Sequence, residues 1–450
     1  MRLTWVQPED LLRHELIQSG AEGRDVAAVA GAWVAAGGTT AVPAGGVSET
    51  AAGPRLRGLA NRLLEDLAAL PAGSEADPEG LEAIIALWPG PPAVMPRPSS
   101  EELFDRAHGA WLGRAAGCLL GKPVEKIPRA GIRAILQSQG RWPLNDYFSG
   151  EGLAAEVGAR WPWNRASRPT SLAEVIDGMP EDDDTNYTML ALALLEQHGR
   201  DFTTDDVARM WLAELPAGRV FTAERIAYRN LLEGLEAPAT ARVRNPFREW
   251  IGAQIRTDLY GWVSPGDPAA AAALAWRDAR LSHTRNGIYG AMFTAALGAA
   301  AMASRDVDEV LAAGLSVVPA RSRLAEAVRL AIEIAAESDS ERALDRLHQA
   351  FGDLHWVHAV NNAALVALGL RAGAGDFTRS VCLTVMGGWD TDSNGATVGG
   401  VVGAMTGAAR LPPRWSAPLR NRIASSLRGF DGAAFDDLAR RTVELVPAVR

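Results

Sequence analysis

Cysteine is scarce in this sequence, which has only Cys118 and Cys382 among its 450 residues. Two cysteines this far apart form neither a disulfide framework nor a zinc-binding pattern, so we expect a reduced, cytoplasmic protein. Basic residues are outnumbered as well, and the formal net charge is −9 at pH 7. General nucleic-acid binders usually carry a basic face, so the charge balance argues against that class.

Long apolar runs are also missing. The longest uncharged apolar stretch, Gly287 to Ala303, is rich in Ala and Gly. It is shorter than the ~20 residues that a membrane-spanning helix needs, so we interpret it as a buried helix and expect no membrane partner. Glu9 and Asp10 come too early for the apolar core of a signal peptide.

Several catalytic and nucleotide-binding motifs are absent. We find no phosphate-binding Gly-Lys-Ser/Thr loop, no dinucleotide fingerprint after a strand and no Gly-x-Ser-x-Gly elbow. No convincing run alternates with period two, whereas nearly every segment after Leu190, including 418–427, has helical apolar spacing. Aromatic residues make up only 6%, and abundant Ala and Gly suit closely packed helices. We therefore predict a compact, multi-helix, all-α fold.

The chain divides into two units at a Pro-rich stretch, 89–98. Residues 1–97 are predicted to be a helical extension without clustered His, Cys or paired carboxylates, which packs on the rest or mediates oligomer contacts. Residues 98–450 hold all the candidate chemistry. Within them, 141–170 is Trp/Pro/Asn-rich and is predicted to be a long loop, which in a compact domain is typically functional or a lid.

The strongest chemical signal is Glu181-Asp182-Asp183-Asp184-Thr185, directly before an apolar run. An acidic N-cap and first turn stabilise a helix start, so a purely structural role is one interpretation. Consecutive carboxylates repel one another, however, and this run exceeds what a cap needs. Oxygen ligands select a hard cation such as magnesium, manganese or calcium, so we favour a metal site.

A second acidic helix start lies about 200 residues later, in Asp390-Thr391-Asp392-Ser393 after two glycines. Alternating Asp residues direct two carboxylates to one side of a turn, although an Asx turn and cap would use the same residues. Two such starts, each heading a helix of small residues, favour a shared dinuclear metal centre.

Two further polar segments are weaker candidates. The segment from Ser282 to Gly290 either caps and fills the core or contacts an anionic or ribosyl ligand at a helix N-terminus. In His355–Asn362, two histidines stand three residues apart, but no carboxylate or cysteine completes a zinc site. The candidate substrate contacts are His283, Asn286, Gly287, Tyr289, Asn361 and Gly388.

Four motifs in this order resemble the ADP-ribosylglycohydrolase family. They are Gly117–Glu125, Asp183-Asp184-Thr185 with the following Met189–Leu192, Ser282-His283 with Gly287 and Gly290, and Gly388–Ser393. The resemblance extends from about Leu103 to Leu445. It implies an all-helical fold with two magnesium ions, or manganese, in a cleft that binds the ribose hydroxyls of ADP-ribose.

The resemblance also implies residue roles. Asp183, Asp184, Asp390, Asp392 and Ser393 would be metal ligands, with Asp182 as an added carboxylate. Glu125 falls where the family places an acidic residue at the catalytic centre, and Glu125 or Asp183 would move the proton as catalytic residue. Asp182 stands where the family commonly has Ser or Thr, Cys118 where it often has Asp, and Trp389 is inserted before Asp390, so the chain is similar to a divergent branch.

The expected activity is magnesium-dependent hydrolysis of a glycosidic bond at the ribose anomeric carbon, with an ADP-ribosylated or otherwise ribosylated substrate. One alternative is an N- or O-glycosidase for a nucleoside, nucleotide or other metabolite. Another is a non-catalytic ADP-ribose-binding or structural protein, since some members of the family are structural. Retention of the acidic set together with Glu125 favours an enzyme.

Overall fold

The protein is helical throughout the part that a computed structural model describes, which comprises residues 2–43, 45–71, 77–336 and 339–448. Within those residues the β-structure consists of isolated bridges, such as Met179 with Ile423. The predicted all-α class is therefore confirmed. None of the described helices has both the length and the apolar character to cross a bilayer.

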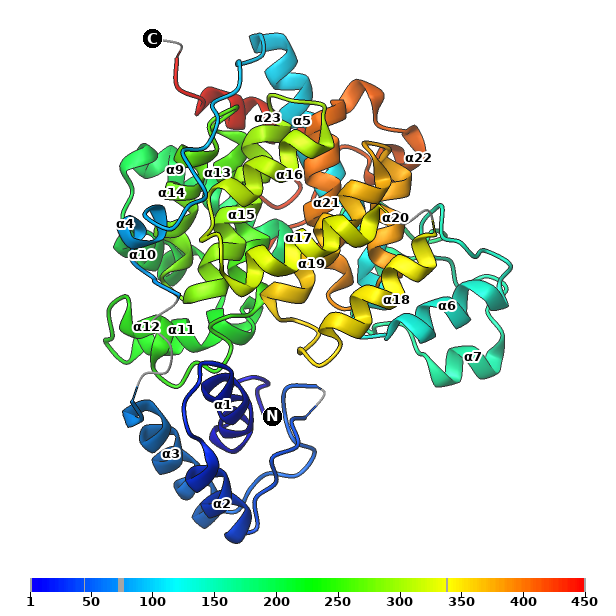
Figure 1. Ribbon diagram of the computed structural model, residues 1–450. Coiled ribbons are helices and arrows are strands. Elements are labelled where there is room, and N and C mark those ends of the chain that lie inside the picture. Colours follow the sequence, from blue (N-terminus) through cyan, green and yellow to red (C-terminus); the bar gives the residue numbers. More distant parts are fainter. Residues whose placement is uncertain (1, 44, 72–76, 337–338, 449–450) are drawn as a thin grey trace.

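The first helices form a lobe beneath the main body (Figure 1). They are α1 (Pro8–Ala21), α2 (Ala27–Ala35) and α3 (Pro54–Ala69). The short α4 (Leu81–Ile85) lies against the body. After it the chain runs over the body surface, where Met95 N–H donates to Gly266 O at 2.8 Å.

Two helices far apart in sequence form the closest pair in the body, α5 (Ser100–Gly121) and α21 (Thr391–Thr406). Glycines recur every fourth residue on both, and a Cβ at Gly117 would overlap the carbonyl of Gly395 on the facing helix. Only glycine permits backbones this close. At one end of the pair, Thr391 Oγ1 donates to Gly121 O at 2.9 Å, which brings the residues after α5 beside the start of α21.

Other helices surround this pair. The α15 helix (Arg285–Ala301) is buried along almost its whole length, as an all-round apolar helix must be, and the interpretation of 287–303 as a buried helix is confirmed. The remaining α-helices are α6 (Arg129–Ser138), α7 (Ala155–Arg160), α8 (Arg168–Ser171), α9 (Asp183–His198), α10 (Thr204–Glu214), α11 (Thr222–Leu232), α12 (Ala239–Arg242), α13 (Asp258–Trp262), α14 (Pro268–Ala279), α16 (Val307–Ser316), α17 (Arg323–Ala335), α18 (Ser340–Phe351), α19 (Ala359–Gly373), α20 (Phe377–Met386), α22 (Pro413–Ser416) and α23 (Phe435–Glu444). Short 3-10 turns occur at Lys122–Val124, Gly199–Asp201, Ala217–Arg219, Ile251–Arg256, Ala408–Arg410 and Ala417–Leu419.

The predicted helix at 418–427 is wrong. Arg420 and Asn421 have φ values of 50° and 48°, in the left-handed region, and end the 3-10 turn before them. Ile423 then bridges to Met179 and Ala433, which holds the segment extended. The amphipathic α23 that follows was not anticipated, and the predicted loop 141–170 contains the short helix α7 and most of α8.

Candidate functional site

Both acidic segments lie at helix starts. Asp182 is the N-cap of α9, and its Oδ1 accepts from Asp184 N–H at 3.0 Å, so the capping interpretation holds for this residue. Asp390 is the N-cap of α21 but accepts no capping hydrogen bond. The Asp390 carboxylate, unlike that of Asp182, therefore does not cap its helix.

The two helix starts meet. Ser393 Oγ, in the first turn of α21, donates to Asp184 Oδ2 of α9 at 3.2 Å. Both segments border one cavity of about 380 Å³. The predicted catalytic and metal-binding residues all line it: Glu125, Asp182, Asp183, Asp184, Asp390, Asp392 and Ser393.

Burial makes this concentration of negative charge costly. For Asp183, burial and then the neighbouring Asp182 and Asp392 raise the carboxyl pKa well above its ordinary value. Burial and nearby carboxylates act in the same direction on the pKa of Asp184 and of Asp390. Burial, followed by the charge of Glu125, raises the pKa of Asp392 to about 7.

A buried lysine pairs with one carboxylate of the cluster. The Lys122 ammonium group is buried and forms an ion pair with Asp182 Oδ2. Burial would raise the pKa of Asp182, but Lys122 and the Asp184 N–H outweigh it and the pKa lies below its ordinary value. Both carboxylate oxygens of Asp182 are thus engaged, one by Lys122 and one by the Asp184 N–H.

The donor set fits a divalent cation. Asp184 Oδ1 is buried without a hydrogen-bond partner; the nearest guanidinium, that of Arg114, lies 3.6 Å away. The facing carboxylates and Ser393 offer only oxygen, which hard ions prefer. In the described part of the chain, ligand atoms of Cys118, Asp182 and Asp184 also lie within 4.8 Å of one another and could hold a metal. In that group, burial raises the pKa of the Cys118 thiol well above its ordinary value, which disfavours the thiolate that would bind.

Glu125 directly follows the 3-10 turn at the end of α5. Its Oε2 accepts from Asn164 Nδ2 at 2.7 Å, and its Oε1 lies 3.2 Å from Lys126 Nζ. Asn164 belongs to the 141–170 segment, which also contributes Ser167 and Thr170 to the cavity. The segment expected to be functional therefore reaches the site and orients the predicted catalytic carboxylate.

The six candidate substrate contacts lie outside the residues that line this cavity. Asn286 Nδ2 donates to Glu249 Oε2 at 2.7 Å, and Tyr289 OH donates to the carbonyl of Pro78 at 2.5 Å. His283 is buried with its Nδ1 2.8 Å from Ser282 Oγ, and burial lowers its pKa well below the ordinary value.

The other three candidates are also in structural positions. Gly287 lies against the carbonyl of Arg248, and Gly388, with φ of 77°, lies against the backbone of Arg129. Asn361 is buried, and its Nδ2 reaches His355 O at 3.3 Å. A role for these six residues in binding substrate stays a prediction.

Sequence reasoning missed several residues of the cavity. Lys122 stands inside the Gly117–Glu125 motif, but nothing in the sequence indicates that its charge is buried. The aromatic residues Trp5, Phe221 and Trp356 also line the cavity. Their positions in sequence share no pattern, so only the fold could bring them together.

The fold and the site define a class of protein: an all-helical chain with a carboxylate-rich cavity between two helix starts. The sequence model of the family described as ADP-ribosylglycohydrolase matches residues 99–449, so this chain belongs to that family. The predicted resemblance is confirmed, and membership supports a hydrolase of glycosidic bonds.

One similar solved structure is described as an ADP-ribosylglycohydrolase-related protein complex. It is 22% identical, the match covers 77% of this chain and 100% of that chain, and the TM-score is 0.48. No curated protein sequence matches this chain.

Proposed function

We propose that the protein is a divalent-metal-dependent hydrolase that cleaves the glycosidic bond at the anomeric carbon of a ribosyl group, and that its substrate is an ADP-ribosyl conjugate of a macromolecule or small molecule. The supporting observation is the meeting of both acidic helix starts and Glu125 in one cavity, linked by the Ser393–Asp184 hydrogen bond. Family membership supports the class of reaction, and the ion and the ribosyl substrate are the parts we propose.

Oxygen atoms of four aspartates and one serine would hold two magnesium or manganese ions: Asp183, Asp184, Asp390, Asp392 and Ser393. When bound, the ions would neutralise these carboxylates and polarise the sugar hydroxyls. Asp182 lies in the same cluster, but it is paired with Lys122 and caps α9, so we assign it the role of positioning Lys122 and the α9 start.

Glu125 is the group we assign to proton transfer. In hydrolysis, the bond from the anomeric carbon to the leaving group breaks and the leaving group takes up a proton, while a bond from the water oxygen forms and Glu125 accepts the proton that the water loses. Asn164 donates to Glu125 and fixes the orientation of the carboxylate toward the cavity. Asp183 is the second candidate, because its carboxyl group lines the same cavity as Glu125.

The experiment compares Glu125→Gln with the wild type for release of ADP-ribose from ADP-ribosylated arginine, serine and nucleoside substrates, with magnesium and with chelator. We expect the substitution to lower the rate by about 10² to 10⁴, the range of general acid–base catalysis, while calorimetry shows unchanged magnesium binding. Glu151→Gln, at an exposed position in the neighbouring loop, is the control. An undiminished rate in Glu125→Gln would overturn the assignment. A wild type that binds ADP-ribose without turnover would make the protein a reader, and release from free nucleosides alone would favour a nucleoside glycosidase.

A further inference from the structure

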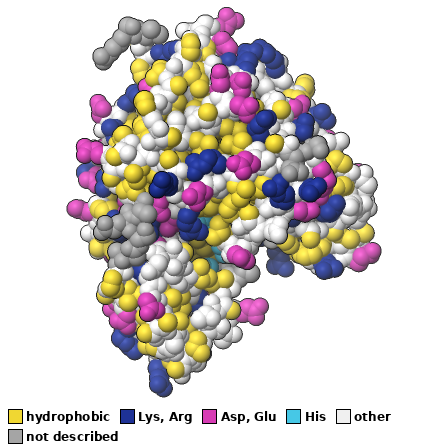
Figure 2. All heavy atoms as spheres, in the orientation of Figure 1, with side chains coloured by type: hydrophobic (Ala, Val, Ile, Leu, Met, Phe, Trp, Pro, Cys, Tyr) yellow, Lys and Arg dark blue, Asp and Glu magenta, His cyan; other side chains and the backbone are white. Residues whose placement is uncertain are grey.

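The N-terminal lobe lies outside the family match, which begins at residue 99, yet it reaches the acidic cavity. Trp5 is one of the cavity-lining residues and comes from the segment before α1. Figure 2 shows a hollow on this face between the lobe and the body above it. The lobe is therefore positioned to shape what the cavity accepts.

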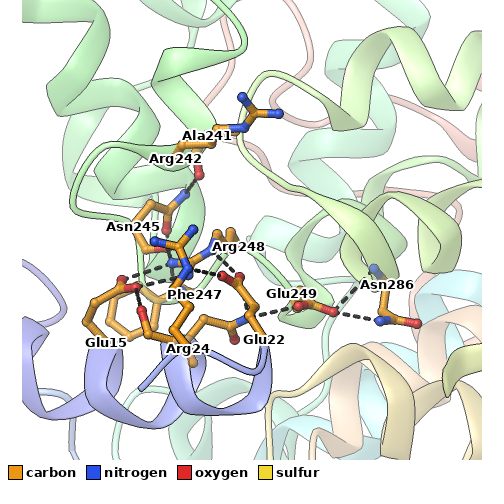
Figure 3. A network of polar contacts seen from close by, with 12 residues as sticks. Glu15, Glu22, Arg24, Ala241, Arg242, Asn245, Phe247, Arg248, Glu249 and Asn286 are labelled. Atoms are coloured by element: carbon orange, nitrogen blue, oxygen red, sulfur yellow. Dashed lines mark hydrogen bonds and ion pairs between the residues drawn. The ribbon is translucent and has the colours of Figure 1, made fainter. Parts of the chain in front are cut away.

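A buried polar network fixes the lobe on the body (Figure 3). Arg248 of the body forms ion pairs with Glu15 at 2.9 Å and Glu22 at 2.7 Å, both on or next to α1. Gln18 Nε2 donates to Glu249 Oε1 at 2.8 Å, and Glu249 in turn holds Asn286. Because removing one partner of a buried ion pair is costly, the lobe has a defined position rather than a loose tether.

Trp5 is held in a costly conformation. Its φ is 60°, a region that bulky residues rarely adopt, and such outliers persist only where the surroundings determine them. A Cβ at Gly46 would overlap the Trp5 indole, so a glycine is needed beside it. The indole packs edge-on against Phe247 and Trp250, with centroid separations of 5.5 and 5.6 Å.

Trp5 and its neighbour Thr4 are connected to the two other aromatic residues of the cavity. The Trp5 ring lies 6.1 Å from that of His355, which in turn lies 5.6 Å from Trp356. Arg225 donates to Thr4 O at 2.8 Å, and its guanidinium lies 5.1 Å from the Phe221 ring. The lobe thus contacts His355 and Arg225, the two residues that lie against the other aromatic side chains of the cavity lining.

We propose that Trp5, Phe221 and Trp356 form a wall of the substrate site that binds a flat aromatic ring of the ribosyl substrate, and that the N-terminal lobe makes this protein selective for substrates with such a ring. The inference rests on the proposed function. The ring is either the adenine of an ADP-ribosyl group or a base attached at the anomeric carbon. Lys126 Nζ, 5.7 Å from the centroid of the Trp356 ring, places a positive charge where a phosphate could join ring and ribose.

The test uses the full chain with magnesium and three probes: ADP-ribose, AMP and ribose 5-phosphate, which has no ring. Calorimetry compares the wild type with Trp5→Ala, Trp5→Phe and Phe221→Ala. Trp33→Phe is the control. Trp33 is buried in the lobe, its Nε1 donates to Thr39 O at 2.8 Å, and it is not among the residues that line the cavity.

Stacking of one base on an aromatic side chain is consistent with about a tenfold change in affinity. We expect Trp5→Ala and Phe221→Ala to lower the affinity for ADP-ribose or AMP by about tenfold and the affinity for ribose 5-phosphate by less than twofold. A loss for ADP-ribose, with or without one for AMP, identifies the ring as the adenine of the conjugate, because AMP carries the same adenine, and a loss for AMP alone identifies it as the base at the anomeric carbon. If Trp5→Ala does not fold, Trp5→Phe replaces it, with an expected loss of several-fold.

An equal loss of affinity for all three probes, or no loss of affinity for the two probes with a ring, would contradict the proposal that these residues bind the ring. An effect in Phe221→Ala but not in either Trp5 variant would overturn the role of the lobe. These outcomes are separate from the proposed activity: ring discrimination without hydrolysis of any conjugate refutes the hydrolase and leaves the wall, whereas hydrolysis without ring discrimination refutes only the wall.

Discussion

Replacing Asp392 by Asn should make the metal-free protein more stable above pH 7 and weaken its binding of divalent cations. Asp392 is buried among carboxylates, and burial followed by the charge of Glu125 raises its pKa from 3.8 to about 7. A carboxyl group whose pKa is higher in the folded state contributes stability that is complete below pH 3.8 and is lost as the pH rises to about 7.

The magnitude follows from that shift. Three pKa units at about 1.4 kcal/mol each correspond to a cost of about 4 kcal/mol for the ionised Asp392 in the metal-free protein. Asn retains the shape without the charge, so the substitution should recover a few kcal/mol at pH 8 and nothing at pH 4. Removing one charge also relieves its neighbours, which acts in the same direction.

The assay is denaturant unfolding of wild type and Asp392→Asn in chelator, from pH 4 to pH 8. The difference between the two proteins is the quantity to follow, because buried histidines with lowered pKa values, among them His14 and His358, give each curve an opposing slope. Asp201→Asn, at an exposed position, is the control for charge removal alone.

Magnesium should reduce the stability advantage of Asp392→Asn over the wild type at pH 8. A ligand at 100 times its dissociation constant stabilises the folded state by about 2.7 kcal/mol, and the variant should gain less than the wild type. A variant that is less stable than the wild type at pH 8 without metal, or a difference that is the same at pH 4 and pH 8, would refute the electrostatic reasoning.

Three further substitutions follow from the same geometry. Lys122→Met leaves Asp182 buried and unpaired, so it should lower the unfolding free energy by about 3–5 kcal/mol. The double variant with Asp182→Asn should recover most of that loss, and equal stability of the single and double variants would contradict the pairing. Gly117→Ala should separate α5 from α21 and abolish magnesium binding measured by calorimetry, whereas Gly31→Ala, which has open space around it, should leave both stability and binding intact. Arg248→Met removes the cation between two buried glutamates of the lobe, so limited proteolysis should cleave the lobe faster while α5 stays protected; unchanged cleavage would show that the network does not fix the lobe.

The sequence by itself determined the fold class and the chemical core of the candidate site. Helical spacing predicts most of the helices because apolar periodicity is local, and the four-residue glycine pattern of α5 predicts a close helix contact. The run Asp182–Asp184 and the pair Asp390 and Asp392 stand out because such charge density is unusual before apolar helices. All of these residues line the cavity, as the resemblance implies.

Only the tertiary structure decided which other residues join them. The polar segment beginning at Ser282 has the composition of a ligand loop, but Asn286 is bound to Glu249 and Tyr289 to the chain before α4, contacts that no local pattern encodes. Lys122 pairs with Asp182, and Trp5 arrives from a lobe with no chemical motif of its own. Local sequence determines which residues can carry charge or form a helix, whereas the partner of each side chain depends on contacts between residues hundreds of positions apart.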